Sequence, residues 1–235
     1  MPMMTKRNIT AAVIVAAGQS MRMDGVDKQL TLLAGVPVLV RSMMAFEIAS
    51  TIDEIVVVTH EDDRALVKTW AEQYKIAKLK AVVTGGETRA DSVQRGFARI
   101  SDTARFVAIH DGARCLITPE NIEKVCRAAY RHNAATAAYP ATDTVKIADR
   151  NGFIVSTPPR KTVWHATTPQ VFHTNMYRAA LATILMPDAT DDSQLIEKLP
   201  VPVKLVDCGR QNIKITYPDD LKIAEILLKE REAQT

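Results

Sequence analysis

The stretch AAVIVAAGQSMRMDGVDKQL, residues 11–30, decides both how this chain folds and what kind of ligand it can hold. Its first half is continuously apolar and predicts a buried strand, which runs into the small residues 16–18. Backbone N–H groups of small residues can approach phosphate oxygens closely. The cations Arg22 and Lys28 follow, and fixed cations offset the charge that develops during phosphoryl or nucleotidyl transfer. We therefore expect a polyphosphate-binding loop here.

The composition is that of an ordinary globular protein. The chain has 235 residues, of which 47% are hydrophobic and 24% are charged. That length suits one large domain, and we expect a single nucleotidyltransferase domain over residues 1–235. The formal net charge of +3 is too small for a protein that coats nucleic acid. The cations should therefore act locally, on small phosphorylated ligands.

The cysteines and the hydropathy indicate where the protein works. Cys115, Cys126 and Cys208 are widely spaced and form no Cys-x-x-Cys pair, so they suggest neither a disulfide framework nor a zinc site. No apolar run approaches the ~20 residues of a membrane-spanning helix, and the N-terminus has no signal-peptide pattern. We expect a soluble, cytoplasmic protein with free thiols that binds neither membranes nor nucleic acid.

Short apolar runs alternate with longer segments of helical character. The runs are continuously apolar, which is typical of strands in a mostly parallel sheet with helices on both faces. We expect strands at residues 11–16, 54–59, 79–84, 105–110, 134–139 and 203–207. We expect helices at residues 37–49, 62–74, 88–100, 118–131, 173–185 and 218–232.

Residues 142–159 interrupt this rhythm. Two short β-like runs, 144–148 and 153–156, flank the sequence Asp-Arg-Asn-Gly at 149–152, which predicts a β-hairpin. A Pro-Pro pair ends the segment, so we expect the hairpin to project from the sheet as an arm. Because an isolated two-stranded hairpin is only marginally stable, we expect a second copy of the chain to cover it.

A glycine turn follows the strand expected at 79–84. Gly85 and Gly86 precede Thr88, where a helix begins. The N–H groups of this turn could bind a base or a phosphate at the end of the strand. Alternatively, the segment is an ordinary glycine turn with Thr88 as the helix cap.

Charged residues follow two other strands, and each has two interpretations. Asp111 comes directly after an apolar strand, where a carboxylate suits a magnesium ion that bridges phosphates, or it forms a plain surface pair with Arg114. Alternation places Asn212 and Lys214 on one side of a further extended run. Lys214 could reach a phosphate, or it could be a solvated lysine.

The segment 160–170 packs cations, hydroxyls and an aromatic pair together. We expect Trp164 to be a core residue rather than a stacking platform for a base. We expect His165 to be a hydrogen-bonded structural residue rather than a general base. By itself the segment indicates no particular chemistry.

In their order along the chain, these motifs resemble one family, the 2-C-methyl-D-erythritol 4-phosphate cytidylyltransferases of the non-mevalonate isoprenoid pathway. The resemblance covers nearly the whole chain. The motifs that carry it are Ala16-Ala17-Gly18 with Arg22-Met23 and Lys28-Gln29, Gly85-Gly86 with Arg89-Ala90-Asp91-Ser92-Val93, His110-Asp111-Gly112-Ala113-Arg114, Asp143-Thr144-Val145-Lys146, Trp164-His165-Ala166 with Thr168-Pro169-Gln170, Thr190-Asp191-Asp192, and Asn212-Ile213-Lys214.

The resemblance implies a Rossmann-like α/β fold with a mostly parallel twisted sheet, helices on both faces and a projecting β-hairpin arm. It implies transfer of CMP from CTP to 2-C-methyl-D-erythritol 4-phosphate, which gives 4-diphosphocytidyl-2-C-methyl-D-erythritol and pyrophosphate. The acceptor phosphate is already anionic, so the protein needs no strong base and must instead align two polyanions and offset their repulsion. The resemblance also implies Mg²⁺ as cofactor and a homodimer formed through the arm.

The resemblance further implies a role for individual residues. The catalytic cations would be Arg22, Lys28 and Lys214. The nucleotide-binding residues would be Ala16, Ala17, Gly18, Gly86, Glu87, Ser92 and Gly112. The acceptor-binding residues would be Arg114, Thr144, Arg160, Thr168 and Thr190, of which the arm of the other subunit brings Thr144 and Arg160. Asp111 would support the metal.

Two positions depart from the family pattern. Ser20 stands where glycine is frequent, and it costs backbone freedom if that position needs a positive φ. Cys115 stands where proline is frequent, so a restraint on φ beside Arg114 is lost. Neither substitution removes a charged group.

Three other activities compete with this interpretation. A ribitol-5-phosphate cytidylyltransferase would share the nucleotide machinery, but residues 89–93 and 164–166 resemble the methylerythritol phosphate branch. A non-enzymatic nucleotide-binding subunit would be expected to lose the cations of the active site, and this chain keeps Arg22, Lys28, Arg114 and Lys214. A dinucleotide-dependent dehydrogenase needs a G-x-G-x-x-G fingerprint, which the loop after the first strand does not supply.

Overall fold

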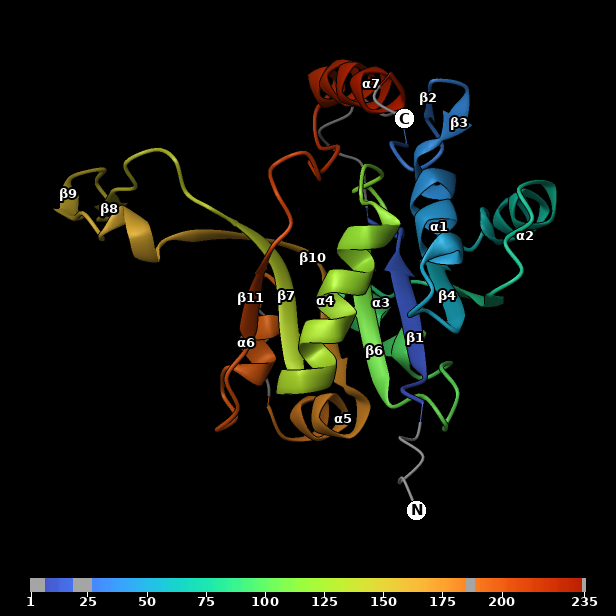
Figure 1. Ribbon diagram of the computed structural model, residues 1–235, viewed down its shortest axis with the longest axis horizontal. Helices are drawn as coiled ribbons and strands as arrows, with labels where there is room; N and C mark the ends of the chain where they lie inside the picture. The colour runs from blue at the N-terminus through green and yellow to red at the C-terminus, as the bar shows by residue number, and fades with distance from the viewer. Residues whose placement is uncertain (1–6, 19–26, 185–188, 234–235) are drawn as a thin grey trace.

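A seven-stranded sheet forms the centre of the computed structural model, which describes residues 7–18, 27–184 and 189–233 (Figure 1). From one edge to the other its strands are β11 (Lys204–Asp207), β7 (Ala134–Pro140), β10 (Trp164–His173), β6 (Phe106–Asp111), β1 (Thr10–Val15), β4 (Glu54–Thr59) and β5 (Leu79–Thr84). Every neighbouring pair is parallel except the two pairs that involve β10. The expected mostly parallel α/β fold is confirmed.

Strand β1 lies in the middle of the parallel part of the sheet. It pairs with β4 on one side and with β6 on the other. The chain therefore continues from β1 toward one edge, through β4 to β5, and later returns to add β6 on the opposite side. Such a reversal of strand order opens a crevice at the carboxyl ends of the strands.

Helices cover both faces of the sheet, as expected (Figure 1). One face carries α1 (Val38–Ile48), α2 (Arg64–Gln73) and α4 (Pro119–His132), and the other carries α3 (Arg89–Phe97), α5 (Thr174–Thr183) and the short α6 (Ser193–Ile196). Alternate residues of β1 contribute to the two layers: Ile14 packs in the same cluster as Phe46 of α1, and Val13 packs with Phe97 of α3. This burial on both faces explains why the strands have no polar alternation.

A third apolar cluster closes the end of the molecule where the strands terminate. It joins α7 (Pro218–Glu232) to the small hairpin of β2 (Leu32–Leu33) and β3 (Val36–Pro37). Ile215 is completely buried in it, and its N–H donates to the carbonyl of Ala113 at 2.9 Å. This anchor places the neighbouring residue, Lys214, beside the end of β6.

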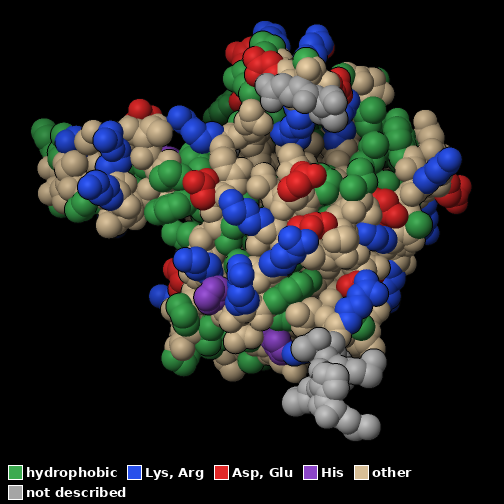
Figure 2. All heavy atoms as spheres, viewed as in Figure 1, with side chains coloured by type: hydrophobic (Ala, Val, Ile, Leu, Met, Phe, Trp, Pro, Cys, Tyr) green, Lys and Arg blue, Asp and Glu red, His purple; other side chains and the backbone are tan. Residues whose placement is uncertain are grey.

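The hairpin predicted at 142–159 projects from the ends of β7 and β10 (Figure 1). Its strands, β8 (Ile147–Ala148) and β9 (Ile154–Ser156), are antiparallel, and Gly152 takes a φ of +85° in the turn. A short 3₁₀ turn, Arg160–Thr162, ends the arm. Hydrophobic and basic side chains gather on the arm (Figure 2), and Phe153 is 72% exposed there.

The structure differs from the expectations mainly in β10. This strand is ten residues long, it lies antiparallel between β7 and β6, and the apolar pattern did not predict it. Trp164, expected in the core, is half-buried at its start. Residues 209–216 were expected to be extended, but they form no strand.

Two expectations about the chain's chemistry can also be compared with the structure. All three cysteines are free and buried, which confirms the free thiols. No helix in the described part of the chain combines the length and apolar character that crossing a membrane requires.

Candidate active site

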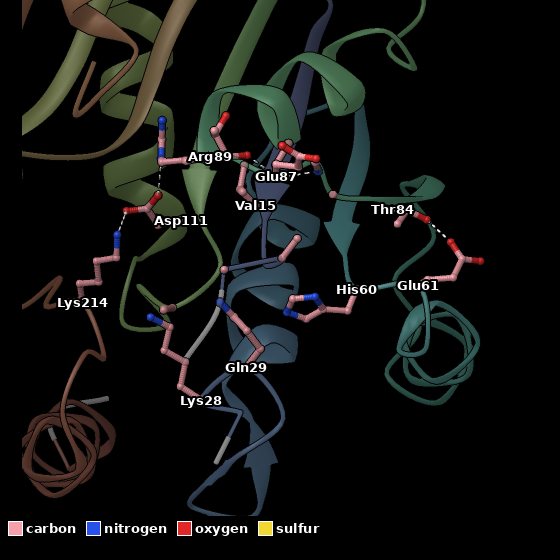
Figure 3. Close-up of a pocket in the computed structure, with 17 residues that line it drawn as sticks. Val15, Lys28, Gln29, His60, Glu61, Thr84, Glu87, Arg89, Asp111 and Lys214 are labelled. Carbon is pink, nitrogen blue, oxygen red and sulfur yellow. Dashed lines mark hydrogen bonds and ion pairs between the residues drawn. The ribbon is translucent and has the colours of Figure 1, made fainter. Parts of the chain in front are cut away.

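A cavity of about 490 Å³ lies where β1, β4, β5 and β6 end (Figure 3). Its walls come from the segments that directly follow these strands and from two remote lysines. The lining residues are Val15, Ala17, Gly18, Lys28, Gln29, His60, Glu61, Thr84, Gly85, Gly86, Glu87, Thr88, Arg89, Ser92, Asp111, Ala113 and Lys214. This is the crevice in which open α/β sheets bind their ligands.

One wall of the cavity consists of backbone, because two glycines approach their neighbours too closely for a side chain. A Cβ atom added to Gly85 would lie 2.2 Å from Cβ of Ala17, and one added to Gly86 would lie 2.2 Å from Cβ of Asp91. The N–H of Gly86 donates to Oγ of Ser92 at 3.0 Å, which fixes the turn. The wall therefore carries no side chain at these two positions, and its backbone is left open to a ligand in the cavity.

The N-terminus of α3 points its backbone dipole at the same cavity. Thr88 caps the helix through a bond from the N–H of Asp91, and the carboxylate of Asp91 accepts from the N–H of Thr88. The helix-cap interpretation of this segment is confirmed, and Thr88 also lines the cavity, while binding of a base or a phosphate by the turn stays a prediction. The positive end of a helix dipole favours a bound anion.

Asp111, at the end of β6, is surrounded by three cations, of which Figure 3 shows Arg89 and Lys214. Its Oδ2 lies 2.9 Å from Nζ of Lys214 and 3.5 Å from Nε of Arg114, and its Oδ1 lies 3.4 Å from Nε of Arg89. Burial alone would raise the pKa of Asp111, but Lys214, Arg89 and Arg114 together lower it well below its usual value. Asp192, which also pairs with Arg89, brings the number of carboxylates to two against three cations, so the cluster keeps a net positive charge, which favours a bound polyphosphate.

A hydrogen-bonded chain fixes the backbone that carries Asp111. The N–H of Asp111 donates to Oγ1 of Thr168 at 3.0 Å, and that hydroxyl lies 3.0 Å from Nδ1 of His110. Nε2 of His110 lies 3.3 Å from the carbonyl oxygen of Arg114, so the ring proton belongs on Nε2 and Thr168 donates to Nδ1. Burial lowers the pKa of His110 to about 3. The ring is therefore neutral and structural.

Three segments that are remote in the sequence meet at Arg114. Its Nη1 donates to the carbonyl of Asn212 at 3.0 Å, and Nδ2 of Asn212 donates to the carbonyl of Thr168 at 2.8 Å. Arg114 and Thr168 do not line the cavity, but both contact Asp111, which does. These residues therefore form a hydrogen-bonded cluster beside the Asp111 side of the cavity.

The structure brings together about half of the residues predicted to form the site. Those that line the cavity are Ala17, Gly18, Lys28, Gly86, Glu87, Ser92, Asp111 and Lys214. Ala16 and Gly112 lie behind the lining, with N–H groups donating to the carbonyls of Val58 and Val15. Arg22, like Ser20, lies outside the described residues.

The remaining predicted residues lie elsewhere in the chain. Thr144 and Arg160 are exposed on the arm, and Nη1 of Arg160 donates to the carbonyl of Thr142 at 3.0 Å. Thr190 is exposed before α6, and its hydroxyl accepts from Nε2 of Gln194 at 2.8 Å. None of these three lines the cavity within this single chain.

Several residues that line the cavity had no predicted role. His60 and Glu61 follow β4, and Arg89 opens α3. The side-chain hydroxyl of Thr84, at the end of β5, donates to the carboxylate of Glu61. The signal that could have found His60 and Glu61 is their position directly after a predicted strand, because strand ends form such sites.

Comparison with known proteins assigns a family to this arrangement. Residues 10–230 match the sequence model of the 2-C-methyl-D-erythritol 4-phosphate cytidylyltransferases. A protein of that name from Dehalococcoides mccartyi (strain ATCC BAA-2266 / KCTC 15142 / 195) is 43% identical over 218 residues, which span 93% of this chain and 95% of the relative. Another from Syntrophus aciditrophicus (strain SB) is 39% identical over 227 residues, 95% of this chain and 97% of the relative.

Solved structures agree with the sequence comparison. The 4-diphosphocytidyl-2C-methyl-D-erythritol synthase from Anaerococcus prevotii DSM 20548 superimposes with a TM-score of 0.84 at 31% identity, over 94% of this chain and 96% of that chain. The 2-C-methyl-D-erythritol 4-phosphate cytidylyltransferase from Thermus thermophilus gives a TM-score of 0.74 at 30% identity, over 93% and 98% of the two chains.

Proposed function

This chain belongs to the 2-C-methyl-D-erythritol 4-phosphate cytidylyltransferase family, and we propose from that premise how its residues carry out the reaction. The enzyme is a nucleotidyltransferase of isoprenoid synthesis, which transfers CMP from CTP to 2-C-methyl-D-erythritol 4-phosphate and releases pyrophosphate. The observation that supports our placement of the reaction is the Asp111 cluster, which sets three cations beside a cavity with a glycine-rich wall.

The glycine-rich wall is the nucleoside half of the site. Gly86, Glu87 and Ser92 lie around cytosine and ribose in this proposal, where the backbone wall accommodates a flat ring. Ala17 and Gly18 bind the triphosphate through their backbone. Ala16 and Gly112 act from behind the lining: their backbone bonds to neighbouring strands hold the loop ends in place.

The chemical step is an in-line displacement at the α-phosphorus of CTP. An oxygen of the acceptor phosphate forms the new P–O bond, the bond to the pyrophosphate oxygen breaks, and no proton need be removed from the nucleophile. Lys28 and Lys214 border the cavity, and with Arg22 they would stabilise the charge of the crowded transition state. The neutral His110, held in its hydrogen-bonded chain, takes no part in proton transfer.

Asp111 suits a magnesium site that is completed by the nucleotide. In the described part of the chain no three His, Cys, Asp or Glu side chains gather closely enough to hold a metal alone. Mg²⁺ usually binds through one or two carboxylates together with substrate phosphates and waters, so a single carboxylate fits. Bound Mg²⁺ would neutralise part of the phosphate charge. Asp111 would supply the protein's ligand.

The acceptor half of the site requires a second copy of the chain in this proposal. Arg114 and Thr168, beside Asp111, and Thr190 would meet the acceptor. Thr144 and Arg160 would come from the arm of the partner subunit. The exposed apolar side chains of the arm support a homodimer, because Phe153 and Val155 are 72% and 67% exposed.

The cellular setting is a further part of the proposal. The three cysteines are free and buried, which is usual for proteins of the reducing cytoplasm, and we place the enzyme there. The mild net charge of +3 agrees with partners that are small anions rather than nucleic acid.

Release of pyrophosphate with different substrates tests the proposed function. The assay combines each of CTP, ATP, GTP and UTP with either methylerythritol phosphate or ribitol 5-phosphate. We expect rapid release only with CTP and methylerythritol phosphate. Faster turnover of ribitol 5-phosphate would contradict the acceptor assignment, and absence of release with every pair would identify a nucleotide-binding protein without turnover.

A further inference from the structure

Arg89 joins the carboxylate of Asp111 to a second, more deeply buried carboxylate. Its Nη1 lies 2.7 Å from Oδ2 of Asp192, whose side chain is only 4% exposed, while its Nε lies 3.4 Å from Oδ1 of Asp111. The two ends of one guanidinium thus contact two acids that are 81 residues apart in the sequence. Figure 3 shows Arg89 and Lys214 on opposite sides of Asp111.

Asp192 is itself held rigidly by groups outside the cavity. The hydroxyl of Tyr177 donates to its Oδ1 at 2.6 Å, and its backbone N–H donates to Oε1 of Gln170 at 2.9 Å. Burial raises the pKa of Tyr177 well above its usual value, so this hydroxyl keeps its proton and donates. The ring of Tyr177 is completely buried and stacks on Phe172 with centroids 5.4 Å apart. Asp192 is therefore a fixed anchor for Arg89.

The contacts to Asp111 divide between its two oxygens. Lys214 and Arg114 both approach Oδ2, whereas among the described residues the side-chain contact to Oδ1 comes from Arg89. Lys214 and Arg114 are the cations that the proposed reaction assigns to substrate phosphates. Arg89 remains bound to the buried Asp192 and has no such task. The orientation of the Asp111 carboxylate therefore depends on Arg89.

We propose that Arg89 is a positioning residue, which Tyr177 and Asp192 anchor so that it holds the carboxylate of Asp111 ready for the metal–nucleotide complex. The inference rests on the proposed role of Asp111 toward Mg²⁺. Arginine suits this task because its planar guanidinium contacts two acids at fixed angles. Burial alone would lower the pKa of Arg89, but Asp192 and Asp111 raise it above its ordinary value, so it stays charged.

Two conservative variants test this role. Arg89→Lys keeps the charge but replaces the planar fork with a single ammonium, which cannot hold both acids in the same geometry. Tyr177→Phe keeps the stacked ring and removes only the bond to Asp192. Outer partners of a metal ligand typically change metal affinity by 10–100-fold, so we expect Arg89→Lys to raise the half-saturating Mg²⁺ concentration about tenfold. Tyr177→Phe should raise it less, in the same direction.

The second measurement does not depend on turnover. Mn²⁺ binding in the presence of CTP is followed by water-proton relaxation, and we expect the affinity of the ternary complex to fall in both variants. Arg178→Ala serves as the control, because Arg178 follows Tyr177 on α5 but is exposed and lies over the ring of Phe97. It should match the wild type in both measurements. If Arg89→Lys does not fold, Tyr177→Phe provides the test.

Three results would contradict the inference. Folded variants with an unchanged metal requirement would show that Arg89 does not position Asp111. A rise in KM for CTP or for the acceptor alone would show that Arg89 contacts the substrate directly. Equal changes in the Arg178→Ala control would show a general effect on structure. Failure of the proposed function is recognised separately, because the wild type itself would then release no pyrophosphate while Mn²⁺ binding still reports on Arg89.

Discussion

Nζ of Lys214 lies 2.9 Å from Oδ2 of Asp111, so a proposed catalytic cation and the proposed metal ligand neutralise each other. The two groups are distant in the sequence but meet at the same end of the sheet: Asp111 ends β6, and Lys214 precedes α7. A phosphate that takes Lys214 as its partner would free the carboxylate for a metal. Nucleotide and metal should therefore bind cooperatively, because the phosphate pairs with Lys214 and the metal pairs with the Asp111 carboxylate that is freed.

This exchange predicts that a divalent metal binds weakly without CTP. Two unit charges about 4 Å apart interact by roughly 1 to 4 kcal/mol between bulk water and the protein surface, so Lys214 should repel a metal at Asp111. We expect Lys214→Met to raise the affinity for Mn²⁺ alone by about tenfold or more, as measured by electron paramagnetic resonance. Lys222→Met, on the exposed side of α7, should leave it unchanged. Equally tight Mn²⁺ binding to the wild type with and without CTP would refute the exchange.

Lys28 provides a direct test of the charge assignment. Removing one preorganised group that stabilises transition-state charge costs ~10²-fold or more in turnover, and we expect this loss for Lys28→Ala. The same loss is expected for Arg22→Ala. Thermal unfolding should change little, since Lys28 lines a cavity rather than the core. Lys68→Ala, on exposed α2, is the matched control. Turnover of Lys28→Ala close to that of the wild type would show that the assignment is wrong.

Arg114 should act on the acceptor rather than on CTP. Its guanidinium contacts Asp111 and the carbonyl of Asn212, outside the nucleoside wall. A hydrogen bond to a charged group contributes about 1.5–3 kcal/mol, so Arg114→Ala should raise KM for methylerythritol phosphate about 10- to 100-fold. Steady-state kinetics with each substrate varied in turn separate the two constants. A rise in KM for CTP alone would place Arg114 in the other half of the site.

The buried His110 predicts that the protein loses stability in mild acid. Its folded pKa is about 3 because of burial, whereas an unfolded histidine titrates near ~6.5. Between those values only the unfolded chain binds the proton, so the stability contributed by neutral His110 is complete above pH ~6.5 and is lost as pH falls toward 3. The slope approaches ~1.4 kcal/mol per pH unit. Asp111, with a lowered pKa, affects stability only below its unfolded pKa of ~3.9.

Urea unfolding at about pH 7.5 and about pH 5 measures this slope. In His110→Gln the titrating group is absent, and the free energy of unfolding should differ less between the two conditions than in the wild type. Val107→Ala, buried in the same strand, should lower stability by a similar amount at both. A wild-type slope in His110→Gln would show that another group causes the acid sensitivity.

Sequence reasoning predicted the parallel half of the fold well because its signals are local. The apolar runs of β4 and β5 coincide with the predicted strands at 54–59 and 79–84. Strand β4 is buried on both faces, and β5, at the edge of the sheet, is only partly buried but still carries its own apolar run. In β10 the pattern is interrupted by Thr167, Thr168 and Gln170, which are polar yet buried. The hydrogen-bond partners of Thr168 and Gln170 come from Asp111, Asn212 and Asp192, and no local pattern could reveal such remote partners.

The site shows the same limit. The sequence allows two interpretations of Asp111 and Arg114, a metal site or a simple ion pair. The two residues do form an ion pair, and Arg89 and Lys214 from distant segments also contact Asp111. Arg89 was read only as part of a motif, because its link to Asp192 depends on how α3 packs near α6. Charge and residue type predicted that cations and a carboxylate would surround a phosphate-binding pocket. The tertiary fold decided which cation meets which acid.

The homodimer predicts that two inactive variants restore each other. Arg160→Ala disables the arm, and Lys28→Ala disables the cavity. In a mixed dimer one site combines an intact cavity with an intact partner arm, while the other site carries both changes. Random mixing makes half of the dimers mixed, so symmetry predicts recovery of about a quarter of wild-type activity.

Phe153→Asp, which places a charge on the 72% exposed ring position, should abolish the recovery and give monomers in analytical ultracentrifugation. Ile48→Asp, at a 67% exposed position on α1, should abolish neither the recovery nor the dimer. Mixtures that stay inactive while dimers persist would show that each active site is built from a single chain.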